Sequence, residues 1–247
     1  MQRYFVTNQQ PADTVELPAD ISHHLVDVMR AKVGAKIEIV CADHQAYLAT
    51  VISLQPAMVR VDQPLNKSVE MPVTVTIACG LPKTKEKPQL IVQKGTELGA
   101  TRIVFFDCQR SISHWTSPRR EKKLARLQKI ANGAAEQSHR TVQPRVVYRD
   151  SWQDVLTDFP TDTAVVAWEE SAKQGEVSRL QATLGKLKAG ERLTAFFGPE
   201  GGLTSAEINA MNDQGVVSVG LGPRILRTET APLYFLSAVS YQTELNG

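Results

Sequence analysis

The stretch Phe197-Gly-Pro-Glu-Gly-Gly-Leu-Thr-Ser-Ala-Glu207 decides the fold prediction. It joins the end of an apolar run to a turn with three glycines, and Thr204 and Glu207 then form the T-x-x-E pattern of a helix capping box. A strand, a glycine turn and a helix in this order are typical of α/β proteins. Glycine also permits positive φ and lets a ligand approach the backbone closely.

A second glycine loop follows soon afterwards. Gly220-Leu-Gly-Pro-Arg-Ile-Leu-Arg-Thr-Glu-Thr230 comes directly after the apolar run Val216–Val219. Both loops therefore leave the carboxyl ends of predicted strands, where open α/β sheets bind ligands. Tight turns that bind nothing are the alternative interpretation, but two consecutive glycine loops favour a binding site.

The chemistry of these loops limits the classes of ligand that they could bind. Neither loop contains G-x-x-x-x-G-K-[ST] or G-x-G-x-x-G, and Glu200 would repel an exposed phosphate. A neutral or cationic adenosine derivative suits the bare glycine amides and the apolar side chains of Leu221, Ile225 and Leu226 better. S-adenosylmethionine, which carries a sulfonium, fits this description.

Outward from the loops, short apolar runs alternate with helical patterns. The predicted strands are Val73–Cys79, Arg102–Phe106, Thr163–Trp168, Leu193–Phe197 and Val216–Val219, with Arg145–Tyr148 as a weaker candidate. The predicted helices are Pro88–Leu98, Pro118–Gln137, Glu176–Leu187, Ser205–Asp213 and Thr230–Leu245. Such alternation predicts a mainly parallel sheet with helices on both faces.

The first 70 residues have a different pattern. The β-branched runs there are Lys36–Cys41, Ala46–Leu54 and Met58–Val61. Separated by turn-like residues, they predict a small antiparallel barrel or sheet, with one short helix near Ile21–Arg30. Gln63–Pro72 holds two prolines and is predicted to be a linker. We therefore predict one domain over residues 1–70 and another over residues 71–247.

Composition excludes several classes of protein. With 42% hydrophobic and 22% charged residues, the chain is neither disordered nor fibrous. No apolar run approaches the roughly 18 to 20 residues of a membrane span, and the first residues lack the apolar core of a signal peptide. Cys41, Cys79 and Cys108 lie too far apart to suggest a disulfide framework or a zinc site. We expect a cytoplasmic protein that uses no metal and no membrane.

Positive charge is concentrated in one window. Residues 110–149 contain ten lysines or arginines against Glu121 and Glu136, although the whole chain carries only +2. Arg119, Lys122, Lys123 and Arg126 fall at i, i+3, i+4 and i+7 of a predicted helix and so share one face. Such a face is the electrostatic pattern that binds a phosphate backbone, and a solvated helix face is the alternative interpretation.

Candidate nucleic-acid contacts follow from this pattern. In the basic window they are Arg110, Arg119, Arg120, Lys122, Lys123, Arg126 and Arg140. The acidic N-terminal domain, with six basic and eight acidic side chains, would need a local patch such as Arg3, Arg30 and Lys32. Lys83, Lys85 and Lys87 could extend the surface, but helix-dipole or solubility roles fit them equally well.

The predicted last helix begins with a cap candidate, Thr230, and is apolar nearly all round. More than one surface must therefore cover it. Burial in the core alone is one interpretation. A homodimer interface is favoured, because the second loop leads directly into this helix.

Four motifs, taken together and in order, identify a family. They are Gln93-Lys-Gly-Thr-Glu-Leu-Gly99, Ala135-Glu-Gln-Ser-His-Arg140, Gly198-Pro-Glu-Gly-Gly202 and Leu221-Gly-Pro-Arg-Ile-Leu-Arg-Thr-Glu-Thr230. The chain resembles the ribosomal RNA small subunit methyltransferase E family of the SPOUT superfamily. Gln2–Phe5 and His23–Gly34 also match, so the resemblance spans nearly the whole chain. One departure is Gly95, where the family commonly has alanine; glycine costs about 1 kcal/mol of helix propensity there.

The resemblance implies properties that the spacing alone does not show. The fold would be α/β, a SPOUT methyltransferase domain with a C-terminal deep trefoil knot, preceded by a small β-rich PUA-like domain that helps to hold RNA. S-adenosylmethionine would bind in the knot of a homodimer. The reaction would be methylation of uridine N3 in 16S rRNA, in the decoding region of the small ribosomal subunit.

Site residues carry over by position. The cofactor contacts would be Gly198, Glu200, Gly201, Leu221, Gly222, Ile225, Leu226, Arg227 and Thr230, with Trp168 as a weaker candidate. Arg227 is the candidate to stabilise negative charge that develops on the uridine carbonyls, and Glu200 could shape the site or accept a proton. In the alternative interpretation, contacts between Arg227 and Glu229 or between Glu200 and the backbone only brace the knot. A non-catalytic RNA-binding or ribosome-assembly factor, and a SPOUT enzyme that acts on the ribose 2′-OH, remain alternatives.

Overall fold

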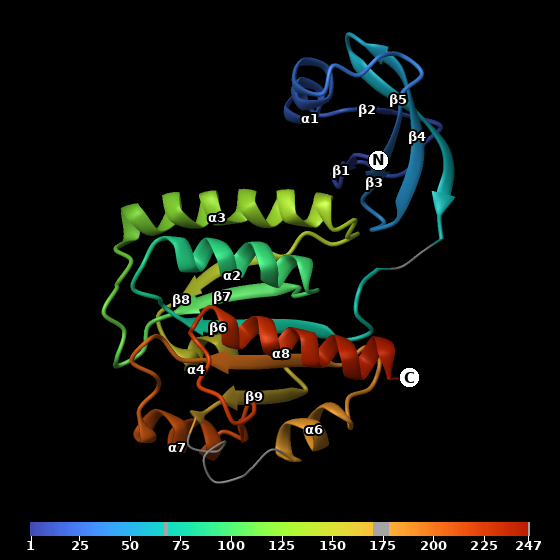
Figure 1. The fold of residues 1–247 in the computed structure, drawn as a ribbon. Helices are drawn as coiled ribbons and strands as arrows, with labels where there is room; N and C mark the ends of the chain where they lie inside the picture. The colour runs from blue at the N-terminus through green and yellow to red at the C-terminus, as the bar shows by residue number, and fades with distance from the viewer. Residues whose placement is uncertain (67–68, 170–177, 247) are drawn as a thin grey trace. The chain divides into compact units, whose positions relative to one another are not determined.

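The computed structural model describes residues 1–66, 69–169 and 178–246 and divides into two compact units (Figure 1). The first unit comprises Met1–Glu70 with Ala135–Val142, and the second comprises Met71–Ala134 with Gln143–Gly247. The division predicted at residue 70 did not include 135–142. This segment belongs with the first unit because the Glu70 carboxylate accepts hydrogen bonds from Arg140 Nε and the Thr141 N–H.

A five-stranded sheet forms the first unit, in the order β1-β3-β4-β5-β2. Its elements are β1 (Arg3–Phe5), β2 (Thr14–Glu16), α1 (Ala19–His23), the π-helical turn η1 (His24–Val28), β3 (Lys36–Val40), β4 (Ala46–Leu54) and β5 (Ala57–Leu65). β1 pairs parallel with β3, so the sheet is mixed and not purely antiparallel. β5 continues to Leu65, so the first three residues of the predicted linker are strand.

A six-stranded parallel sheet forms the second unit, in the order β11-β9-β10-β6-β7-β8. The strands are β6 (Thr74–Gly80), β7 (Arg102–Phe106), β8 (Arg145–Arg149), β9 (Thr163–Ala167), β10 (Arg192–Phe197) and β11 (Val217–Val219). Every neighbouring pair is parallel, which confirms the sheet prediction. The weaker candidate at Arg145–Tyr148 is β8.

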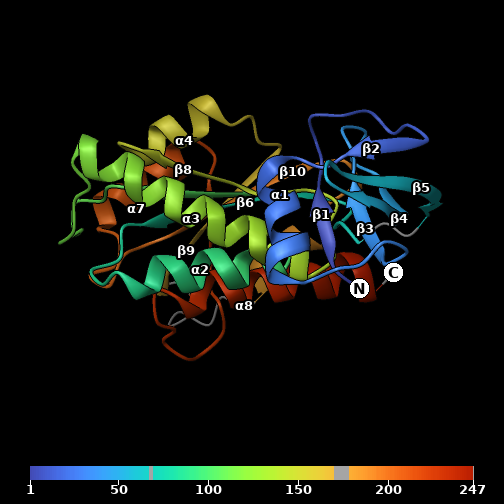
Figure 2. The ribbon, with the colours of Figure 1, turned by 90° about the horizontal axis from the view of Figure 1, so that it is seen from above.

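Helices cover both faces of this sheet (Figure 2). They are α2 (Glu86–Glu97), α3 (Ser117–Gln137), α4 (Trp152–Asp158), α6 (Ser178–Leu184), α7 (Ser205–Asp213), α8 (Thr230–Ser240) and the π-helical turn η2 (Tyr241–Leu245). α4 was not predicted from the sequence. Of the helix predicted over Glu176–Leu187, residues 176–177 lie outside the described part of the chain, and α6 ends at Leu184.

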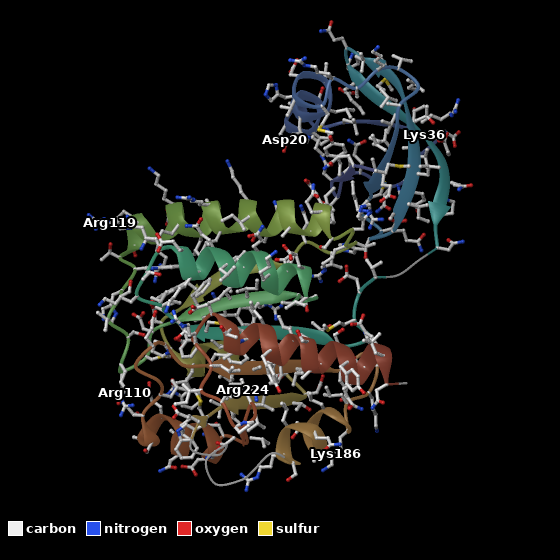
Figure 3. All side chains as sticks on the ribbon, in the orientation of Figure 1. Asp20, Lys36, Arg110, Arg119, Lys186 and Arg224 are labelled. Atoms are coloured by element: carbon white, nitrogen blue, oxygen red, sulfur yellow. The ribbon has the colours of Figure 1, made fainter. Side chains whose placement is uncertain are left out.

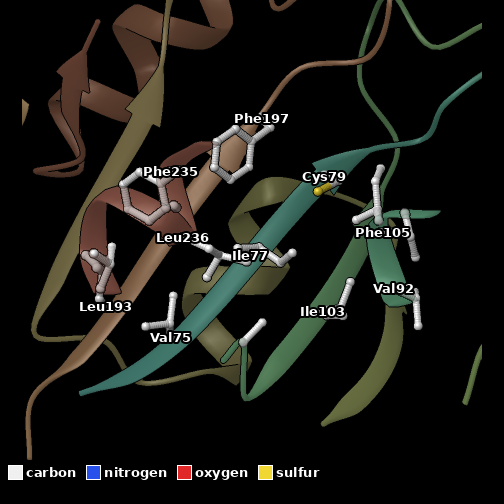
Figure 4. Close-up of a cluster of buried hydrophobic side chains, with 14 of the residues drawn as sticks. Val75, Ile77, Cys79, Val92, Ile103, Phe105, Leu193, Phe197, Phe235 and Leu236 are labelled. Atoms are coloured by element: carbon white, nitrogen blue, oxygen red, sulfur yellow. The ribbon is translucent and has the colours of Figure 1, made fainter. Parts of the chain in front are cut away.

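Alternating strand residues separate two cores. Val75, Ile77 and Phe105 point to the face covered by α2, α3, α6 and α8 (Figure 4), whereas Val104 and Phe196 pack with α4 and α7 on the other face. Strands buried on both faces explain why the apolar runs lacked a clean period of two.

Gly95 lets α2 approach the sheet closely. A Cβ at this position would lie 3.1 Å from Ile77 Cδ1 and 3.8 Å from Leu236 Cδ1 of α8. The departure from alanine therefore removes a tight contact where α2 meets both the sheet and α8. The close packing that Gly95 permits offsets its cost in helix propensity.

The last helix is less uniformly buried than the sequence predicted. Phe235, Leu236 and Val239 are buried in α8, but Tyr234 and, in η2, Tyr241 are exposed. Within the described residues, no helix has the length and apolar character to cross a bilayer. The trefoil knot stays a prediction.

Candidate cofactor site

The two glycine loops meet at one edge of the second unit. The first glycine loop (residues 198–204) follows β10, and the second glycine loop (residues 220–229) follows β11 and leads into α8. Because all six strands are parallel, their carboxyl ends lie at the same edge, and Figure 1 shows the arrowheads of β6, β8 and β9 pointing to it. A cavity of about 1080 Å³ opens there between the loops.

Most of the predicted cofactor residues line this cavity. They are Trp168, Gly198, Glu200, Gly201, Leu221, Gly222, Ile225, Leu226 and Arg227. Thr230 does not line it. The N-cap of α8 is Glu229, and the Thr230 N–H donates to the Arg227 carbonyl at 2.8 Å, so Thr230 is the first helical residue and not the cap.

Local sequence chemistry shapes the first glycine loop. Thr204 and Glu207 form the predicted capping box, with the Glu207 N–H donating to Thr204 Oγ1 and the Thr204 N–H donating to Glu207 Oε2 at 2.7 Å. Glu207 is buried, and its Oε1 accepts the Gln109 N–H at 3.0 Å. The loop after β7 is thereby held against the loop after β10. Gly222 in the second glycine loop has φ +88°, a conformation that other residues rarely adopt.

Arg110 also braces the first glycine loop. Its Nη1 donates to the Gly201 carbonyl at 3.1 Å, and a Cβ on Gly201 would lie 3.0 Å from Arg110 Cβ. The sequence predicted Arg110 as an RNA contact on charge alone. The structure places its exposed side chain at the cavity and against the loop backbone.

Glu200 is held by α2 and by the loop after β6. Its carboxylate accepts a hydrogen bond from Lys87 Nζ at 2.7 Å and from the Lys83 N–H at 3.1 Å. Burial raises the pKa of Glu200, but these hydrogen bonds outweigh burial and leave the pKa below its ordinary value. A carboxylate that is already engaged and more acidic than usual is a poor proton acceptor, so the geometry favours a bracing role over the predicted proton transfer.

Arg227 is exposed and lines the cavity together with Arg224, which Figure 3 labels. The alternative interpretation was that Arg227 braces Glu229. The ion pair at Glu229 is instead made by Lys87, whose Nζ lies 3.2 Å from Oε2. The sequence offered no signal for this, because Lys87 lies 142 positions from Glu229 along the chain.

The predicted positive face of α3 consists of three exposed cations and one partly buried cation. Arg119, Lys122 and Arg126 are exposed, and Figure 3 shows Arg119 at the start of α3. Lys123 lies over the Trp115 ring at 4.9 Å, and burial lowers its pKa. Lys123 therefore packs against an aromatic ring as well as carrying a charge. Arg120, a predicted RNA contact outside that face, also packs on an aromatic ring, with its guanidinium 4.6 Å from the centre of the Tyr148 ring.

Two predicted RNA contacts in the first unit are structural instead. Arg3 is 5% exposed and pairs with Glu38 at 2.8 Å, and Arg140 is 2% exposed and pairs with Glu70. Buried, paired guanidinium groups do not reach a phosphate backbone. Arg30 and Lys32 are both exposed. The part of the chain described by the structure holds no cluster of three or more His, Cys, Asp or Glu arranged for a metal ion.

Comparison with known proteins identifies the family. A model described as an RNA methyltransferase domain matches residues 69–240, and one described as an RNA methyltransferase PUA domain matches residues 17–56. The ribosomal RNA small subunit methyltransferase E of Bacillus subtilis is 46% identical to this chain and covers 99% of it and 98% of its own length. This chain belongs to the ribosomal RNA small subunit methyltransferase E family.

Solved structures agree with this family membership. A crystal structure of a hypothetical protein is 42% identical, covers both chains completely and has a TM-score of 0.89. The methyltransferase E of Neisseria gonorrhoeae, solved with bound S-adenosyl methionine, is 28% identical over 97% of each chain with a TM-score of 0.82. The predicted fold class, a β-rich PUA domain followed by an α/β parallel-sheet methyltransferase domain, is confirmed.

Proposed function

We propose that this chain transfers a methyl group from S-adenosylmethionine to N3 of a uridine in 16S rRNA, in the decoding region of the small ribosomal subunit. The cavity between the two glycine loops is the observation that carries the proposal. Family membership supports the ribosomal RNA substrate, and the Neisseria gonorrhoeae relative supports the methyl donor. The choice of uridine N3 rests on the family resemblance.

The cavity residues fit the methyl donor. The volume of about 1080 Å³ is slightly larger than the roughly 300 to 1,000 Å³ typical of small-molecule sites, so the cavity has room for the whole donor. Leu221, Leu226 and Trp168 supply apolar walls for an adenine, and the glycine amides supply donors without side chains in the way. When bound, the donor supplies an activated methyl group on a sulfonium, which is an excellent leaving group.

The residues of the chain have three tasks in this reaction. Uridine N3 lies on the pairing edge, so the protein must hold the base unpaired. The base must also lie in line with the donor, and such orientation supplies a large share of the rate enhancement. As the N3–methyl bond forms and the methyl–sulfur bond breaks, the N3–H bond must also break, and its proton passes to water. We assign to Arg227 the third task, donation of hydrogen bonds to the carbonyl oxygens as they gain negative charge. Glu200 keeps the first glycine loop in place.

RNA contacts come from exposed cations in both units. In the second unit they are Arg119, Lys122 and Arg126 on α3, and in the first unit Arg30 and Lys32. Cations of this kind bind the phosphate backbone, which predicts affinity that falls steeply with salt.

We also propose a homodimer in the cytoplasm. Large apolar side chains are exposed at the C-terminal end of the second unit, with Tyr241 60% and Leu245 73% exposed. Ile225 in the second glycine loop is 76% exposed. Ile225 lines the cofactor cavity, so a second copy that covers Ile225 would help to close it, whereas Tyr241 and Leu245 lie beyond the other end of α8.

Methyl transfer with nucleoside identification tests the proposal. Labelled S-adenosylmethionine is incubated with the protein and either intact small subunits or naked rRNA, and the labelled nucleoside is identified. We expect 3-methyluridine. A 2′-O-methylated nucleoside would favour the ribose enzyme, whereas salt-sensitive RNA binding without any donor affinity would favour a non-catalytic assembly factor.

A further inference from the structure

A single lysine contacts both glycine loops. Lys87 lies in the first turn of α2, and its Nζ is 2.7 Å from Glu200 Oε1 and 3.2 Å from Glu229 Oε2. Glu200 belongs to the first glycine loop, and Glu229 ends the second one and caps α8. Lys87 therefore joins three elements, α2 and the two loops, that the chain order keeps far apart.

The position of Lys87 is not explained by the helix itself. A cation in the first turn of a helix opposes the helix dipole, which favours anions there. The three side chains are also largely withdrawn from water, with Lys87 21%, Glu200 31% and Glu229 14% exposed. Partial burial of charges costs desolvation free energy that only close pairing offsets. A lysine whose only role was solubility would be expected neither in the first turn of a helix nor in a partly buried cluster of charges.

The same cluster reaches a third loop. The backbone N–H of Lys83, in the segment that follows β6, donates to both carboxylate oxygens of Glu200 at 3.1 Å. β6 and β10 are neighbours in the sheet, so this contact is made at the carboxyl edge where the cavity opens. The arrangement around Glu200 thus fixes loop backbone as well as side chains.

We propose that Lys87 is a positioning residue for the methyl-donor site, holding the two glycine loops together through Glu200 and Glu229. The inference rests on the proposed function, because it assigns Lys87 to the same cavity. Without the ammonium group, two carboxylates would share a partly buried space and repel each other. The loops would then separate and bind the donor less tightly.

Direct contact between Lys87 and the donor is the competing explanation, since Lys87 also lines the cavity. The two explanations differ in how they respond to removal of a carboxylate. If Lys87 acts by neutralising Glu229, then Glu229→Gln should partly restore donor affinity in a Lys87→Met background. If Lys87 binds the donor itself, the second substitution restores nothing.

Titration calorimetry with S-adenosylmethionine tests the inference. For Lys87→Met we expect the donor Kd to rise about tenfold, and for Lys87→Met with Glu229→Gln to recover by about threefold or more. Lys94→Met is the matched control, because Lys94 lies in the same helix and forms its ion pair with Glu97, three residues further along that helix and away from both glycine loops. Its Kd should stay within about twofold of wild type.

Kinetics and folding provide independent readouts. Methyl transfer by Lys87→Met should show a raised KM for the donor with kcat changed far less, because positioning is restored when the donor saturates the site. If Lys87→Met does not fold, Glu229→Gln alone decides: a Kd raised about threefold supports the inference, and an unchanged Kd overturns it.

Three results separate failure of this inference from failure of the proposed function. A wild-type protein that binds no donor refutes the proposed function. A wild-type protein that binds while Lys87→Met behaves like Lys94→Met overturns the positioning role. Absence of recovery with Glu229→Gln also overturns it, in favour of direct contact.

Discussion

Gly80→Ala should damage the cofactor site through a single methyl group. Gly80 ends β6, and a Cβ there would lie 2.6 Å from Cys108 Sγ, 2.6 Å from Pro199 Cδ and 2.8 Å from the Pro199 nitrogen. Carbon atoms in contact prefer about 3.5 to 4.0 Å, so Pro199 must move by about 1 Å. Because Pro199 is the second residue of the first glycine loop, its backbone carries the displacement into the cavity.

The structure sets the expected magnitudes. Overpacking of this kind costs about 1 to 3 kcal/mol of unfolding free energy, which corresponds to a fall in Tm of roughly 2 to 12 °C for a chain of this size. A loop moved by about 1 Å should also raise the Kd for S-adenosylmethionine by at least about tenfold. Differential scanning calorimetry and titration calorimetry measure the two effects separately.

Gly133→Ala is the matched control. Gly133 lies inside α3, and nothing approaches a Cβ built there within 4 Å. Alanine is favoured over glycine in a helix by about 0.8 to 1 kcal/mol, so Tm should rise while the donor Kd stays unchanged. The packing argument would be refuted if Gly80→Ala matched the wild type in both Tm and Kd.

Three further predictions concern catalysis, RNA binding and pH. Arg227→Ala should lower the single-turnover methylation rate about 10² to 10³-fold at saturating donor, and a rate near wild type would remove Arg227 from catalysis. Lys122→Glu combined with Arg126→Glu should weaken RNA binding and reduce the slope of log K against log salt concentration by about 0.7 to 0.9 for each lost phosphate contact. Lys186→Glu is the control, because Figure 3 places Lys186 away from α3. An equal loss of RNA affinity in both variants would contradict the RNA surface on α3. Because the pKa of Glu200 is lowered, its ion pair with Lys87 is fully present above the ordinary carboxyl pKa and is lost only as the pH falls below it. The affinity for the donor should therefore stay constant from pH 7 to 5.5. A fall in affinity within that range would argue against the contact between Glu200 and Lys87.

The parallel sheet and its loops could be predicted because their signals are local. Buried strands are continuous apolar runs, and the capping box at Thr204 and Glu207 lies within four residues. The cavity followed from a rule of topology, since loops after parallel strands meet at one edge. β1 and β2 were missed because neither three-residue strand forms an apolar run, whereas β11 lies within the apolar run Val216–Val219.

Pairings between distant residues could not be predicted from the sequence. Arg3 and Arg140 looked like RNA contacts until the structure paired them with Glu38 and Glu70, which are 35 and 70 positions away. Charge patterns count cations but do not reveal which cations are already neutralised. Lys87 was missed in the same way, because both of its partners lie more than 100 positions along the chain.

A crystal structure with S-adenosylmethionine bound tests the central claim most directly. We predict electron density for the donor between residues 198–203 and 221–228, with its adenine against Leu221 and Leu226. Density for the molecule at any other place, or a cavity closed by its own side chains at saturating donor, would contradict the assignment of this cavity to methyl transfer.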